Sequence, residues 1–162
     1  MRNNVLAGVL AGLIAGIVFG IMMQLMKAPT PDGHAVPMMM MVALVVKSNS
    51  VAVGWLYHLF NSAVIGGIFG WLLGSPTADR VSVVAGRGAL YGFGWWILGG
   101  LILMPLRLGM PAFAPLRMPP MRPAAMGSLI GHLIYGVVLG IAYAWLRRRV
   151  IHRRLAAAAS AH

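Results

Sequence analysis

Two histidines are the residues of this sequence best placed to do chemistry in an apolar setting. His58 and His132 each lie inside a long apolar stretch, and Asn61 and Tyr135 follow them by one helical turn on the same faces. Ionisable side chains are costly inside hydrocarbon, so each is a functional hypothesis. Two facing imidazoles could bind a haem iron axially, or a copper ion. We therefore take His58 and His132 as candidate metal ligands, and Asn61 and Tyr135 as further candidate ligand residues.

Methionines offer a second soft ligand close to the apolar stretches. Thioethers suit Cu(I), so these methionines could complete a copper site with the histidines. The competing interpretation is that methionine is a flexible apolar filler and that each histidine bonds a backbone carbonyl. We favour this second interpretation, because the chain lacks cysteine and a His-x-x-x-His pair. The methionines concerned are Met38, Met39, Met40, Met41, Met104, Met110, Met118, Met121 and Met126.

Other catalytic groups are scarce. The only acidic residues, Asp32 and Asp79, fall between the apolar stretches, so paired-carboxylate catalysis is not available. Ser62 and Ser128 have no histidine and acid in a triad relation. The sequence therefore predicts a protein that is not an enzyme.

The composition places the residues discussed above in a membrane. Of the 162 residues, 60% are hydrophobic and only 9% are charged, and the mean hydropathy is +0.84, whereas a soluble domain carries about a quarter charged residues. Four stretches are long enough to cross a bilayer, near residues 4–26, 51–74, 81–104 and 125–146. We expect a single all-α membrane domain over residues 1–162, folded as a four-helix bundle.

The second and fourth stretches are copies of each other. HLFNSAVIGGIFGWL, from His58, aligns without gaps with HLIYGVVLGIAYAWL, from His132, and the first and third stretches align more loosely through Gly12 and Gly88. The chain is thus predicted to hold two tandem two-helix repeats, about residues 4–74 and 81–146, followed by a basic tail over 147–162. Copies that each contain two spans share one orientation across the membrane.

Small residues line one face of every predicted helix. Such rows let helix backbones approach closely in lipid. We expect them to pack the four helices together, while the unbroken row of the first helix could instead face another subunit. The glycines are Gly8, Gly12, Gly16, Gly20, Gly66, Gly70, Gly88, Gly92, Gly136 and Gly140.

The basic residues lie near the ends of the apolar stretches and give a formal net charge of +11. This placement argues against nucleic-acid binding and favours both termini on the cytoplasmic side. The densest cluster is expected to contact anionic lipid headgroups. It consists of Arg147, Arg148, Arg149, Arg153 and Arg154.

The chain resembles the YagU-like family of small inner-membrane proteins, whose biochemical function is unknown. The resemblance lies in GLIAGIVFG followed by a Pro-rich connection, and in MPLRLGMPAFAPL leading into GSLIGHLIYG and a terminal arginine cluster, within residues 104–154. It implies a small multi-pass protein linked to acid tolerance, and it implies no catalytic residues. The Met-rich connections depart from the family pattern.

Together these features predict a non-enzymatic, multi-pass protein of the bacterial inner membrane. Its expected role is that of an accessory or stabilising subunit, with a second membrane protein or a further copy of itself as partner. The first alternative is a haem- or copper-binding module that uses His58 and His132 with the methionines on the outer side. The second alternative is a small transporter or an acid-tolerance protein.

Overall fold

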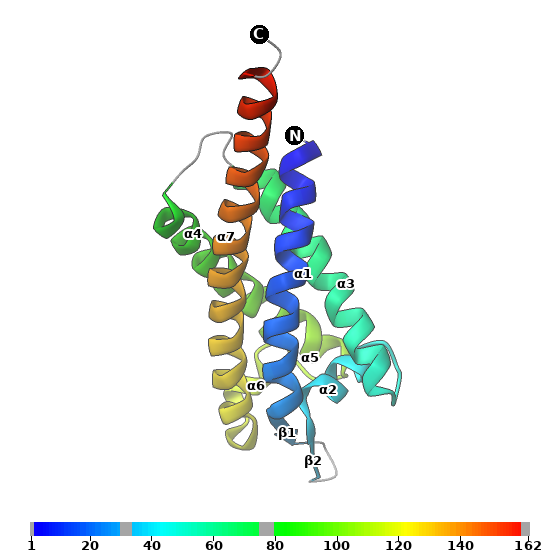
Figure 1. Cartoon of the computed structure of the whole chain (residues 1–162). Coiled ribbons are helices and arrows are strands. Elements are labelled where there is room, and N and C mark those ends of the chain that lie inside the picture. Colours follow the sequence, from blue (N-terminus) through cyan, green and yellow to red (C-terminus); the bar gives the residue numbers. More distant parts are fainter. Residues whose placement is uncertain (1, 30–33, 75–79, 160–162) are drawn as a thin grey trace.

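Four long helices dominate the computed structural model, which describes residues 2–29, 34–74 and 80–159 (Figure 1). All four are long and apolar enough to cross a membrane, over Asn3–Leu25, Val51–Leu72, Val81–Arg107 and Pro119–Arg149. The predicted all-α four-helix bundle is confirmed. The helices are α1 (Arg2–Leu25), α3 (Val51–Leu72), the run of α4 (Val81–Trp95), η1 (Trp96–Leu103) and α5 (Met104–Arg107), and α7 (Arg122–Ala159).

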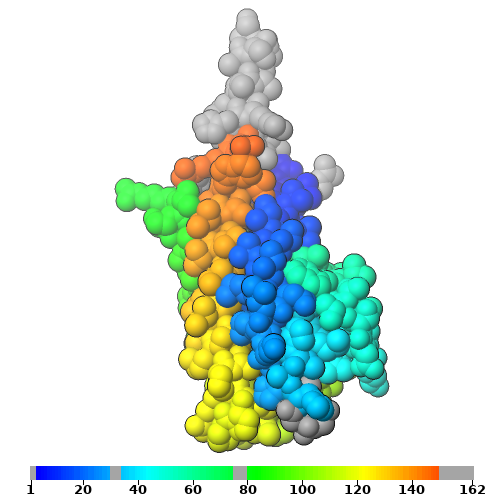
Figure 2. Space-filling view, turned by 60° about the horizontal axis from the view of Figure 1, so that its bottom comes forward, coloured from blue at the N-terminus to red at the C-terminus, as the bar shows by residue number. Residues whose placement is uncertain are grey.

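The bundle has two central and two outer helices. Helices α1 and α7 lie side by side, α3 packs against α1, and α4 packs against α7 (Figures 1 and 2). The start of α1 and the end of α7 lie at the same end of the bundle, as expected for two hairpins in series. Large apolar side chains such as Leu56 and Leu90 remain exposed on the outer helices, where lipid would cover them.

The α1–α3 pair and the α4–α7 pair each cross through glycine, with backbone against backbone. A Cβ added at Gly12 of α1 would collide with the carbonyl oxygen of Ser62 in α3, and one at Gly88 of α4 with that of Gly136 in α7. These two contacts occupy matching positions in the aligned copies. In lipid, such contacts stabilise the helix pair through the dispersion attraction between closely apposed backbones.

The other glycines of the predicted rows also lie within the bundle. The row of α1 therefore faces α3 and does not present an open face to another subunit. The residue that an added Cβ would meet can be given for each of these glycines. It is Gly66 for Gly8, the Ser62 side chain for Gly16, the Trp55 ring for Gly20, Gly8 for Gly66, Asn4 for Gly70, His132 for Gly92, Gly88 for Gly136 and Val84 for Gly140.

The third predicted helix differs from a plain α-helix in its second half, because Trp96–Leu103 forms a π-helix. Proline has no N–H, so Pro105 cannot bond the carbonyl of Leu101 four residues earlier. The N–H of Phe113 donates to that carbonyl instead, at 2.7 Å. Phe113 has a φ of +62° in this arrangement, and the connection folds back against η1.

The fourth helix begins earlier and ends later than residues 125–146, since α7 covers Arg122–Ala159. Pro123 is tolerated in its first turn, where an N–H would have no partner in the helix. The arginines and alanines beyond residue 146 favour helix, which extends the end.

The connection from α1 to α3 and the connection from α5 to α7 gather at the end of the bundle opposite the start of α1 (Figure 1). An antiparallel ladder pairs β1 with β2, and the short helix α2 then packs against α3. The elements are β1 (Lys27–Pro29), β2 (Ala35–Pro37), α2 (Met38–Val45), α6 (Ala114–Arg117) and η2 (Pro119–Met121).

Candidate functional site

His58 is buried between α3 and α1, where it joins the two helices. Its Nε2 lies 2.9 Å from the carbonyl oxygen of Gly16. A carbonyl can only accept, so Nε2 carries the proton in this bond. The hydroxyl of Ser62 donates to the carbonyl of His58 at 2.8 Å. One imidazole nitrogen is therefore committed to the backbone of α1.

His132 forms its hydrogen bond through Nδ1, whereas His58 uses Nε2, and its partner lies in its own helix. Its Nδ1 donates to the carbonyl of Ser128 at 2.8 Å. The ring of Phe19 packs edge-on against both imidazoles, with centroid distances of 5.6 Å to His58 and 4.8 Å to His132. A haem or metal ion shared by the two imidazoles would have to displace this ring. The geometry matches the interpretation in which each histidine bonds a carbonyl.

Two tyrosines of the second copy bond across to the first. The hydroxyl of Tyr135, 4% exposed, donates to the carbonyl of Ser62 at 3.0 Å, and that of Tyr91 donates to the carbonyl of Ile65 at 2.8 Å. Asn61 lies half-buried on α3. The hydroxyl of Tyr135 is thus used to hold α7 against α3.

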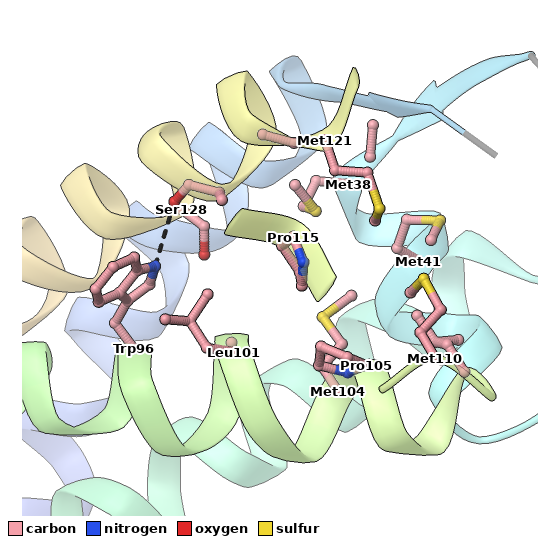
Figure 3. A pocket seen from close by; sticks show the side chains of 15 residues that line it. Met38, Met41, Trp96, Leu101, Met104, Pro105, Met110, Pro115, Met121 and Ser128 are labelled. Carbon is pink, nitrogen blue, oxygen red and sulfur yellow. Dashed lines mark hydrogen bonds between the residues drawn. The ribbon is translucent and has the colours of Figure 1, made fainter. Parts of the chain in front are cut away.

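The methionines converge elsewhere, around a partly enclosed cavity of about 50 Å³ at the connection end of the bundle (Figure 3). Of the nine predicted methionines, Met39, Met40, Met118 and Met126 do not line it. Apolar residues and Ser128 complete the wall, and Ser128 is also the residue whose carbonyl accepts from His132. The lining methionines are Met38, Met41, Met104, Met110 and Met121.

Two features of this region were not predicted. Phe19 was not singled out because its contacts with both histidines depend on how α1 packs against α7, although its place one turn after Gly16 puts it near the glycine face. The methionine cavity depends on the fold-back of the chain after Pro105. Within the described residues, no three histidine or acidic side chains come together as a metal-binding group.

The described part of the arginine cluster lies at the far end of α7. The guanidinium of Arg149 stacks over the ring of Trp145 at 3.6 Å, a cation–π contact. Arg147 is half-buried and Arg148 is exposed. The side chains of Arg153 and Arg154, and both acidic residues, Asp32 and Asp79, lie outside the described part of the chain.

Comparison of the chain with family models, with curated proteins and with solved structures finds no match. The likeness to the YagU-like family stays a prediction from the sequence.

Proposed function

We propose that this multi-pass membrane protein is a non-enzymatic accessory or stabilising subunit of a larger membrane assembly. The observation that carries the proposal is an open glycine face on the α4 and η1 run. A Cβ added at Gly86, Gly94 or Gly99 would meet nothing within 4 Å. Glycine in a helix is about 1 kcal/mol less favourable than alanine. In lipid, glycine on a helix surface lets another helix approach closely.

The surroundings of this face suit a helical partner. Leu90 is 73% exposed and lies one turn from Gly86 and one turn from Gly94. A large side chain between two glycines gives a helix surface both a protrusion and hollows that another helix can fill. We expect the partner to be a second membrane protein or another copy of this chain, in a bacterial inner membrane, with anionic lipid at the arginine cluster.

The alternatives rest on weaker support. A haem- or copper-binding module built on His58 and His132 requires space between the two imidazoles that the ring of Phe19 now occupies. A transporter requires polar groups along a path, whereas Tyr91 and Tyr135 bond backbone carbonyls inside the bundle. Family likeness alone suggests a part in acid tolerance.

Native electrophoresis of gently solubilised membranes tests the proposal. The wild-type chain is expected to migrate in a species larger than its monomer, and Gly86→Leu with Gly94→Leu is expected to release the monomer. Neither substitution meets a neighbour at Cβ, so the bundle itself should fold. Ala52→Leu, at an exposed alanine of α3, is the matched control. A wild-type chain that migrates only as a monomer would refute the proposal, as would a double variant that stays in the assembly.

A further inference from the structure

Five thioether side chains from four separate segments surround one cavity. Met38 and Met41 come from α2, Met104 from α5, Met110 from the connection after it and Met121 from η2 (Figure 3). Methionine is a soft ligand and has no charge. None of the residues that line the cavity carries an ionisable side chain. The site therefore offers sulfur without compensating negative charge.

The backbone around the cavity is held by specific contacts, so the sulfurs are brought together by the fold. The Leu101 carbonyl ties the later connection to η1 through Phe113. The N–H of Met38 donates to the carbonyl of Met26 at 2.8 Å, which fixes the start of α2 to the end of α1. Gly54 lets the other side of α2 approach α3 closely, at Met39.

The cavity's size and lining restrict what it can hold. Its volume of about 50 Å³ exceeds the roughly 30 Å³ that one water molecule fills in the liquid. Ser128 supplies the one side-chain hydroxyl of the lining, while a buried water needs two to four polar partners. A divalent ion would be costly in an uncharged apolar site. A soft monovalent ion loses less on entry and gains sulfur ligands.

We propose that this cavity binds Cu(I) through two or more of these five methionine sulfurs, without a histidine ligand. The site is distinct from His58 and His132, which do not line the cavity. It requires no partner subunit, so it stands or falls separately from the accessory role. Binding involves no redox step, because copper enters and stays in its reduced form.

The first test measures metal affinity of the full-length protein in detergent. Ag⁺ serves as a redox-inert probe, and Cu(I) is added under anaerobic conditions against a competing chelator. Met41→Leu, Met104→Leu, Met110→Leu and Met121→Leu combined leave one of the five sulfurs at nearly constant volume, and a loss of affinity of about tenfold or more is expected. Met39→Leu is the matched control, since Met39 is fully buried on the same helix but does not line the cavity. Its affinity should equal that of the wild type.

The second test separates thioether from imidazole ligands. Thioethers have no proton to lose, so affinity should stay constant from about pH 8 to about pH 5, whereas a histidine ligand would be lost on acidification. X-ray absorption of the wild-type complex should show sulfur as the only ligand type. The proposal is overturned by absence of binding, by equal binding in the quadruple methionine variant, or by nitrogen in the first coordination shell.

Discussion

At the scale of single residues, the same side chain serves different ends in the two copies. His58 and His132 align in sequence, yet His58 bonds a neighbouring helix through Nε2 while His132 bonds its own helix through Nδ1. The sequence located both residues and offered the carbonyl interpretation, but it could not tell which nitrogen is used, because that depends on the distance between helices. Only His58 should therefore contribute strongly to the α1–α3 contact.

We expect His58→Ala to destabilise the bundle by about 2–4 kcal/mol, from a lost buried hydrogen bond and an emptied ring site. Its free energy of unfolding can be measured in detergent by titration with a denaturing surfactant. Leu56 is exposed on the same helix as His58 and provides a control, so Leu56→Ala should stay within about 0.5 kcal/mol of the wild type. Equal stability of the two variants would contradict the structural role of His58.

The absorption spectrum of the purified protein separates this role from haem binding. Because Phe19 packs against both imidazoles, protein from haem-replete cells should show no Soret band. Stoichiometric haem that disappears in His132→Ala would contradict this expectation.

At the scale of elements, regular patterns were predictable and long-range ones were not. The glycine rows repeat every fourth residue, so their packing function could be predicted from spacing alone. The π-helix was not predicted, and neither was the fold-back after it, in which the N–H of Phe113 bonds the carbonyl of Leu101, twelve residues earlier. The methionine cavity was not predictable either, because its sulfurs come from separate segments that only the tertiary structure brings together.

Two glycines on one helix give a sharp test of the crossings. Gly88→Ala should destabilise the bundle by about 1–3 kcal/mol, because the new methyl group meets the carbonyl of Gly136. Gly86→Ala meets nothing within 4 Å and should be neutral or stabilising by up to about 1 kcal/mol. Thermal unfolding of the two variants in detergent measures the difference. A smaller loss in Gly88→Ala than in Gly86→Ala would contradict the crossing.

At the scale of the whole molecule, apolar stretches and turns sufficed to predict four spans and their order. The central position of α1 and α7 was not predictable, because each helix has small residues on one face and several pairings satisfy them. Of the two side chains that join the hairpins, Tyr135 was singled out as a candidate ligand residue and Tyr91 was not singled out. Their partners are main-chain carbonyls, which no sequence pattern marks.

The contact between the hairpins should survive a break in the chain. Fragments covering residues 1–74 and 80–162, produced together, are expected to assemble, because α1 packs directly against α7. Co-purification through a tag on one fragment measures this. Tyr135→Phe removes the bond to Ser62 and should weaken recovery. Failure of the wild-type fragments to co-purify would show that the intervening residues are needed to hold the hairpins together.

The two tyrosyl hydrogen bonds between the hairpins also bear on how far the duplicated halves have diverged. Both bonds run one way, from the second copy to carbonyls of α3 in the first. Where the second copy has Tyr91 and Tyr135, the first has Ala15 and Asn61. Two first copies would lack both phenolic donors. In both bonds the second half is the donor and the first half is the acceptor, so the two halves are not equivalent at this contact.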